Sequence, residues 1–388
     1  MKIGLVLTND WELRGDGSGD YFRLQHRPLE AFMAVAEDHG ARLTLMAEVG
    51  QQWAHMELAR SRGWASEIVH AYEEILRHAV KRGHDVQLHL HPTWLGAHHD
   101  GRKWILDYRK WALPSLSADE IRRVLKDGKR YLERVLRPVD ANYRCVAFRA
   151  GAYCIEPSRE VVSALVEAGF LFDTSVVPGA VFSGQYDFRE VHSNCLPWFV
   201  DPECIRRSHG QAAGLLELPI CTARMWDSAL LRRGIGLQYG AWMSRQDRGW
   251  FGAKRAYCDQ TYPVNHRPMS RRPASRTLGG WARAALWRRT VPLDYDNLAP
   301  EAFLRVIETA LRQERRVRSA QDRPAFPVIA TGHLKSVQNL DNIHRILDLV
   351  RARLKEHLTY WTIREAGQHC AGQWATPRGA TRSRTHPH

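Results

Sequence analysis

Two histidines lie two residues apart at the end of one predicted strand. Residues 83–92 read GHDVQLHLHP, and apolar and polar residues alternate with the period of a strand. Side chains two apart on a strand point to the same face, so His89 and His91 would present two imidazoles side by side. Neutral imidazole is a common zinc ligand. The pair therefore indicates a metal site, and the alternative is two satisfied polar residues where Pro92 ends the strand.

A pair of carboxylates follows the first predicted strand, which covers residues 3–7. Asp10 and Glu12 are separated by Trp11, so both carboxylates can face the same centre. One of them can bind a metal ion while the other remains a general base for water. This spacing is suited to hydrolysis, and it leaves open which carboxylate takes which role.

An arginine and a further histidine follow two other predicted strands. Arg149 comes after residues 143–148 and His333 comes after residues 327–330. A nearby cation lowers the pKa of a carboxylate, so Arg149 could hold Asp10 ionised. His333 could act as the general acid for a leaving group. Together with two imidazoles and two carboxylates, these residues have the roles needed for hydrolysis at a carbonyl.

Alternating strands and helices must position these residues. Glycine and proline residues mark the ends of segments whose apolar periodicity alternates between strand and helix, with short connections. This β-α-β order implies parallel strands with helices packed outside. In a closed parallel barrel of about seven strands the carboxyl ends of the strands meet on one face, where the polar residues would gather. The predicted strands are 3–7, 42–47, 85–91, 143–148, 170–175, 215–220 and 327–330; the predicted helices are 28–39, 66–82, 117–136, 157–169, 300–313 and 339–354.

Composition indicates a globular protein. The chain has 388 residues, of which 44% are hydrophobic and 25% are charged. We find no run of 18 apolar residues, so no membrane span is expected. The apolar start is too short for a signal-peptide core. Seven cysteines, an odd number scattered along the chain, are most simply reduced thiols in the cytoplasm.

The formal net charge of +14 is concentrated in one region. Residues 222–290 contain 14 Lys/Arg and 3 Asp/Glu, a difference of +11. We predict a single domain over residues 1–370, with a basic, Trp- and Arg-rich insertion at about 222–295 and a disordered basic tail at 371–388. The insertion could contact sugars or phosphates, or form a structural or oligomer surface. A nucleic-acid surface is disfavoured because no nucleic-acid-binding motif is present.

Several segments are similar, in order, to motifs of the NodB-type polysaccharide deacetylases (carbohydrate esterase family 4), in a divergent branch with an Asp-x-Glu first motif. The match covers roughly residues 1–180, 213–221 and 325–357. It rests on the carboxylate motif at 7–12, the histidine motif at 83–91, the arginine motif at 148–153, the segment 169–175 and the final histidine motif at 333–335.

The resemblance implies a distorted (β/α) barrel of about seven strands that removes an N- or O-acyl group, usually acetyl, from a sugar of a polysaccharide, glycan precursor or glycoconjugate. It also implies a divalent metal, which we expect to be zinc. The roles carried over are Asp10 as base, with Arg149 and His333 as the other catalytic residues. The metal ligands would be Glu12, His89 and His91, and the candidate substrate-binding residues are Tyr153 and Trp94. A sugar-binding protein without catalysis is the alternative.

Three departures from the family pattern are visible. The family has adjacent aspartates where Trp11 separates the two carboxylates here. Its second histidine falls four residues after the first, where this chain has Thr93. His91 would therefore replace that histidine as the second imidazole ligand, and His98 and His99 are the alternatives. Its arginine motif carries a proline where this chain has Gly151 and Ala152.

Overall fold

The structure is a computed structural model that describes residues 2–182, 184–191, 193–209, 214–226, 288–317, 325–336 and 340–374. Most of the predicted insertion and most of the predicted tail lie outside these residues. Among the described residues, no helix has both the length and the apolar character needed to cross a membrane.

In the described part of the chain, ten strands form one mixed sheet in the order β11-β10-β12-β7-β6-β3-β2-β1-β15, and β16 pairs with β1. The path from β12 to β15 is parallel throughout, whereas β10 pairs antiparallel with β11 and β12. The strands are β1 (Ile3–Trp11), β2 (Leu43–Glu48), β3 (Asp85–Leu90), β6 (Ala147–Ala150), β7 (Phe172–Asp173), β10 (Trp198–Asp201), β11 (Cys204–Ser208), β12 (Leu216–Glu217), β15 (Phe326–Ala330) and β16 (Leu358–Tyr360).

The sheet curls back on itself beyond β12. Ile220 forms a parallel bridge with Ile329 of β15, and the Cys221 amide donates to the Ile329 carbonyl at 2.9 Å. The result is a curled α/β sheet of the barrel type. Its ten strands exceed the predicted number of about seven, because β10, β11 and β16 are additional. Three two-stranded ribbons lie outside it: β4 (His98–His99) with β5 (Trp104–Ile105), β8 (Val181–Phe182) with β9 (Tyr186–Asp187), and β13 (Thr222–Trp226) with β14 (Arg288–Pro292).

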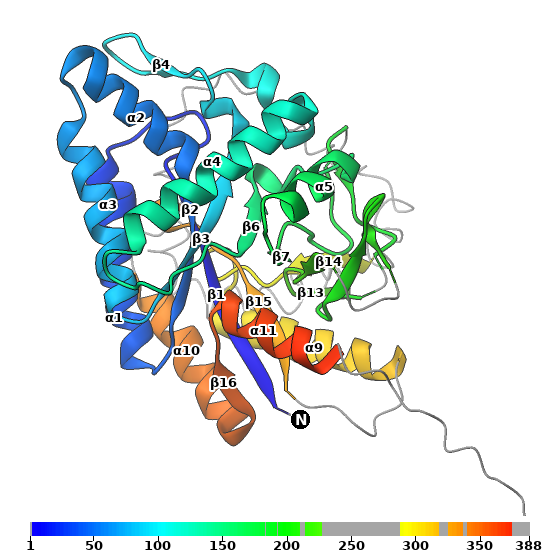
Figure 1. Cartoon of the computed structure of the whole chain (residues 1–388). Helices are drawn as coiled ribbons and strands as arrows, with labels where there is room; N and C mark the ends of the chain where they lie inside the picture. Colours follow the sequence, from blue (N-terminus) through cyan, green and yellow to red (C-terminus); the bar gives the residue numbers. More distant parts are fainter. Residues whose placement is uncertain are drawn as a thin grey trace, which may run out of the picture.

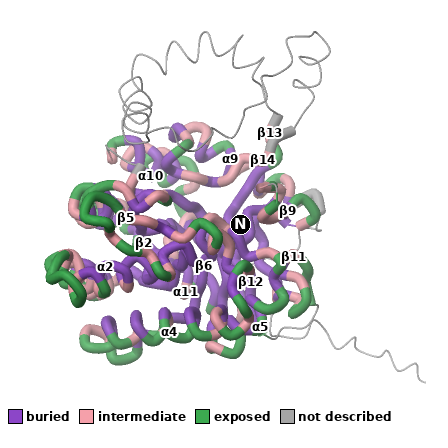
Figure 2. The backbone as a smooth tube through the Cα atoms, turned by 90° about the horizontal axis from the view of Figure 1, so that it is seen from above, coloured by how far each residue is buried: buried purple, intermediate pink, exposed green. Residues whose placement is uncertain are grey.

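Helices cover the outside of the sheet (Figure 1). Around it α2 packs against α3, α3 against α4 and α4 against α5, while α9 packs against α10. Buried segments occupy the centre and exposed segments lie mainly at the periphery (Figure 2). The helices are α1 (Arg27–Asp38), α2 (Val49–Arg62), α3 (Ser66–Lys81), α4 (Ala118–Leu136), α5 (Arg159–Glu167), α9 (Pro300–Val317), α10 (Asp341–Leu354) and α11 (Ile363–Trp374).

Trp11 explains how an Asp-x-Glu pair is presented at the end of β1. Its indole packs against the rings of Tyr72 and Tyr21, with centroids 4.7 and 6.2 Å away, and its Nε1 donates to a backbone carbonyl at 3.1 Å. Because side chains alternate along a strand, anchoring Trp11 in the core turns Asp10 and Glu12 to the opposite face. The pair therefore shares one face although its members are not adjacent in sequence.

We expect Trp11→Ala to destabilise the protein by about 3–5 kcal/mol, because a fully buried indole leaves a cavity. Urea unfolding would measure the loss. Trp64→Ala is the matched control: Trp64 is exposed, and its removal should cost under about 1 kcal/mol. Equal costs for the two variants would contradict the anchoring role of Trp11.

Candidate metal centre

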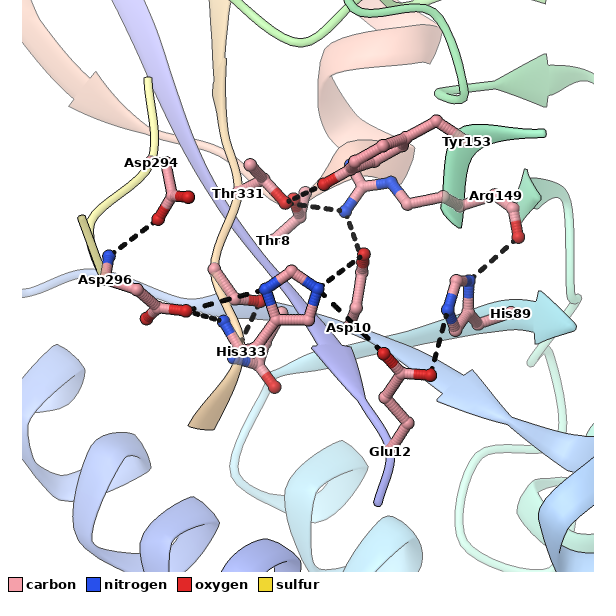
Figure 3. Close-up of polar contacts among 12 residues, drawn as sticks. Thr8, Asp10, Glu12, His89, Arg149, Tyr153, Asp294, Asp296, Thr331 and His333 are labelled. Carbon is pink, nitrogen blue, oxygen red and sulfur yellow. Dashed lines mark hydrogen bonds and ion pairs between the residues drawn. The ribbon is translucent and has the colours of Figure 1, made fainter. Parts of the chain in front are cut away.

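The polar residues predicted at the strand ends converge on one face of the sheet. The register aligns Glu48 of β2 with His89 of β3, and His89 with Arg149 of β6. Figure 3 shows Asp10, Glu12, His89 and Arg149 turned toward one another, with His333 arriving after β15. Parallel strands place their carboxyl ends together, which is why residues so far apart in sequence meet here.

The two histidines of the His-x-His segment lie beside Glu12. Glu12 Oε2 is 2.8 Å from His91 Nε2 and 3.6 Å from His89 Nε2, and the two imidazole centroids are 4.9 Å apart. His89 Nδ1 lies 2.9 Å from the Arg149 carbonyl, which can only accept, so Nδ1 carries the proton. His89 Nε2 is then left with a lone pair, is buried, and has no hydrogen-bond partner among the described residues.

This arrangement fits a divalent cation. A histidine that donates one ring N–H to a backbone carbonyl while its other nitrogen lacks a partner has the orientation of a metal-binding histidine. Two imidazoles and one carboxylate are a donor set that zinc accepts, with a fourth position left for water or substrate. One ligand atom from each of Glu12, Glu48, His89 and His91 lies within 4.8 Å of the others.

Glu48 is a member of this group that the sequence prediction missed. It ends β2, accepts from the Gly50 amide at 2.8 Å, and accepts from the His91 amide at 2.6 Å. Burial raises the pKa of Glu48 to about 8. Both oxygens of Glu48 accept main-chain hydrogen bonds, so its contacts fix the main chain at His91 beside the proposed ligands. Its position at the end of a strand was the signal that could have identified it.

Asp10 forms a buried ion pair with Arg149. Arg149 Nη1 donates to Asp10 Oδ1 at 2.6 Å. Arg149 Nε donates to the Thr174 carbonyl at 3.0 Å, which fixes the guanidinium in place. Burial alone would raise the pKa of Asp10, but the Arg149 charge and the neighbouring histidines bring it below its usual value. Asp10 is therefore ionised at neutral pH, and its Oδ2 remains directed toward His333, 3.5 Å from Nε2.

His333 lies between two carboxylates. Its Nδ1 is 3.5 Å from Asp296 Oδ2, and its backbone amide also donates to Asp296. Burial alone would lower the pKa of His333, but the hydrogen bond and charge of Asp296, together with Asp10, raise it above the usual value. Asp296 was missed because it directly follows the predicted insertion, although the bridge between Asp294 and Thr331 brings this segment to β15.

The two predicted substrate-binding residues lie in different surroundings. The Tyr153 hydroxyl is 3.2 Å from Thr331 Oγ1, which also accepts from Arg149 Nη1 at 3.3 Å, so Tyr153 borders the site. Trp94 is buried in a small apolar cluster and packs against Trp104. Trp94 is thus not brought into the polar group, and its role in binding substrate remains a prediction.

The alternative histidines lie apart from Glu12, Glu48, His89 and His91, which are called the ligand group below. His98 and His99 form β4, where His98 is exposed and the His99 ring packs against Trp104 at 5.3 Å. Neither belongs to the group that includes His91.

Gly151 leaves the space that the His91 ring occupies. A Cβ at residue 151 would lie 2.5 Å from His91 Cγ and 2.8 Å from the Leu90 carbonyl oxygen. We expect Gly151→Ala to displace His91 and weaken zinc binding by roughly tenfold or more, as measured by calorimetric titration. Gly15→Ala is the control, because a Cβ there meets nothing within 4 Å. Unchanged zinc affinity in Gly151→Ala would count against His91 as a ligand.

The sequence matches no protein-family model and no curated protein. Among solved structures, a protein of Mycobacterium smegmatis described as a polysaccharide deacetylase is 13% identical, with a TM-score of 0.47 and 98% of this chain and 94% of that chain covered. A Pseudomonas aeruginosa PAO1 protein with the same description is 12% identical, with a TM-score of 0.44 and coverages of 96% and 92%.

The PuuE allantoinase is 11% identical, with a TM-score of 0.43, and 96% of this chain and 92% of that chain are covered. Similarities this low carry no argument about family or activity. The site geometry must support any functional conclusion.

Proposed function

We propose that this protein is a metal-dependent hydrolase that removes an N- or O-acyl group, most simply acetyl, from a sugar of a polysaccharide, glycan precursor or glycoconjugate. The observation that carries the proposal is a buried Asp10–Arg149 pair and a His333–Asp296 pair that meet beside the ligand group. A base and an acid facing each other 3.5 Å apart, next to two imidazoles and a carboxylate, are suited to acyl transfer to water.

Glu12, His89 and His91 are the residues that would hold the cation, and their donor set favours zinc. The bound cation would polarise the acyl carbonyl and lower the pKa of water. Asp10 takes a proton from water as water oxygen bonds to the acyl carbon. His333 gives a proton to the sugar nitrogen or oxygen as its bond to that carbon breaks. Arg149 keeps Asp10 ionised and oriented.

The sugar substrate rests on the order of the motifs in the sequence. We also propose the single domain over residues 1–370. The cytoplasmic location is part of the same proposal, and it is supported by the odd number of cysteines scattered along the chain.

Acetate release from a panel of acetylated amino sugars and O-acetylated sugars tests the function, using metal-stripped protein, zinc-loaded protein and protein treated with a chelator. We expect release that depends on zinc and is abolished by the chelator. If the protein binds sugar equally well with and without the chelator and releases no acetate, it is a sugar-binding protein without catalysis.

The rate should have a bell-shaped dependence on pH. Asp10 acts when ionised, so the rate falls as pH drops through its lowered pKa; His333 acts when protonated, so the rate falls as pH rises through its raised pKa. Asp296→Asn removes a charge that stabilises protonated His333. We expect the alkaline limb of kcat/KM to move to lower pH, whereas Asp348→Asn, at an exposed carboxylate, should leave it in place. An unmoved alkaline limb in Asp296→Asn would exclude His333 as the acid tuned by Asp296.

A further inference from the structure

The two oxygens of Glu12 face different partners. Oε2 lies toward the imidazoles, at 2.8 Å from His91 and 3.6 Å from His89. Oε1 accepts a hydrogen bond from the Lys335 ammonium and lies 3.9 Å from His333 Nε2. One carboxylate therefore offers its ligand-side oxygen to the histidines and gives its other oxygen to a lysine.

Lys335 is held firmly in this position. It lies in the short helical turn Leu334–Ser336 just after His333, and its Nζ also donates to the Leu13 carbonyl at 3.2 Å. The side chains of Lys335 and Glu12 are only 15% and 6% exposed. The Coulomb attraction within an ion pair so shielded from water is stronger than in an exposed pair, and salt screens it only weakly.

The charges of the site nearly cancel through these pairs. Arg149 balances Asp10 at 2.6 Å, and Lys335 balances Glu12. Burial raises the pKa of Glu48 to about 8, and Asp296 faces His333, whose pKa is raised. A dication placed among His89, His91 and Glu12 would therefore meet little net negative charge. Because positive charges close to the two oxygens of one carboxylate repel each other, the ammonium opposes the cation.

We infer that Lys335 sets the metal affinity of this centre: it restricts Glu12 to ligation through Oε2 and offsets its charge, so the cation is held more weakly than the same ligands would hold it alone. The inference rests on the proposed metal centre. Its consequence is a site that exchanges its cation and whose loading follows the free zinc concentration.

A hydrogen bond to a ligand can also strengthen metal binding by orienting it. The orientation of Glu12 has other supports, since the Leu13 amide donates to Gln51 Oε1 at 2.8 Å and Trp11 is fixed in the core. These contacts fix the main chain on both sides of Glu12 without Lys335, so we expect the charge of Lys335 to outweigh its orienting effect.

Two substitutions separate these effects. Lys335→Gln removes the charge and keeps a hydrogen-bond donor, whereas Lys335→Met removes both. In calorimetric titration of metal-stripped full-length protein with zinc, we expect both variants to bind about tenfold or more tightly than the original protein. Lys126→Gln, at an exposed lysine on α4, should leave the affinity unchanged. An unchanged affinity in Lys335→Gln together with a weaker affinity in Lys335→Met would overturn the inference in favour of orientation.

The melting temperature of the metal-free protein gives a second readout. Both Lys335 variants leave the buried Glu12 carboxylate without its ammonium partner, so Tm should fall by about 2 °C or more while zinc affinity rises. If Lys335→Met does not fold, Lys335→Gln decides the question. Absence of zinc binding by the original protein would overturn the inference together with the metal centre. Zinc binding without acetate release would remove only the proposed activity, because affinity alone tests Lys335.

Discussion

Asp10→Asn should reduce kcat by about 100- to 10,000-fold and leave zinc binding largely intact. The substitution removes the base that faces His333 Nε2 at 3.5 Å, and general bases contribute effects of this size. Steady-state acetate release and the zinc content of the same preparation measure both quantities. Arg149 loses a buried charge partner in this variant, so the melting temperature should also fall. The activity assays should therefore be run well below that temperature.

The same experiment decides between the two carboxylates of the Asp-x-Glu motif. If Asp10 is the base and Glu12 the ligand, Asp10→Asn keeps zinc and Glu12→Gln loses it. The reverse pattern would exchange their roles. Asp20→Asn, at an exposed carboxylate in the following loop, is the control and should retain both zinc and activity.

His89→Ala should abolish stoichiometric zinc binding and reduce activity to background. His89 presents a buried Nε2 that has no hydrogen-bond partner in the described part of the chain, and a site with three protein ligands does not compensate for a lost one. We expect the zinc affinity to fall by about 100-fold or more, as measured by metal analysis after dialysis and by calorimetric titration.

His98→Ala supplies the comparison for His89→Ala. His98 is exposed on β4 and lies apart from the ligand group, so zinc content and activity should not change. Zinc loss in His98→Ala with retention in His89→Ala would move the metal centre to the β4–β5 ribbon.

Much of the fold followed from local sequence signals. The Ser117 capping box is present at the start of α4, and the alternation of residues 85–91 corresponds to β3. The first strand was predicted too short, because Thr8 and Asn9 are polar. In the structure the side chains of both residues form buried hydrogen bonds. Thr8 Oγ1 donates to the Ala330 carbonyl at 2.6 Å, and Asn9 Nδ2 donates to the Tyr295 hydroxyl at 2.9 Å.

Among the described residues, the helices α2 and α11 were not predicted. The buried side of α2 includes the polar residues Gln51, Gln52 and His55, so its apolar stripe is weak. The start of α2 is capped by Glu48, which accepts from the Gly50 amide. The second unpredicted helix, α11, extends to Trp374 and so overlaps the first residues of the predicted tail.

The sequence could predict which strand ends carry the site residues, but not which side chains contact one another there. Asp10, His89 and Arg149 could be proposed because each follows an apolar run, and parallel strands carry such ends to one face. Asp296 lies in a turn and Lys335 in a short helical turn, and the positions of both segments depend on tertiary packing. The division of Glu12 between two partners is likewise a property of the folded molecule alone.

The gap at Gly151 has a consequence for how this protein can diverge. Since a Cβ at residue 151 would overlap the His91 ring, the glycine and the histidine constrain each other as one unit. In homologues these two positions should therefore covary: His91 should be accompanied by glycine, and chains with a bulkier residue at 151 should have relocated the second histidine.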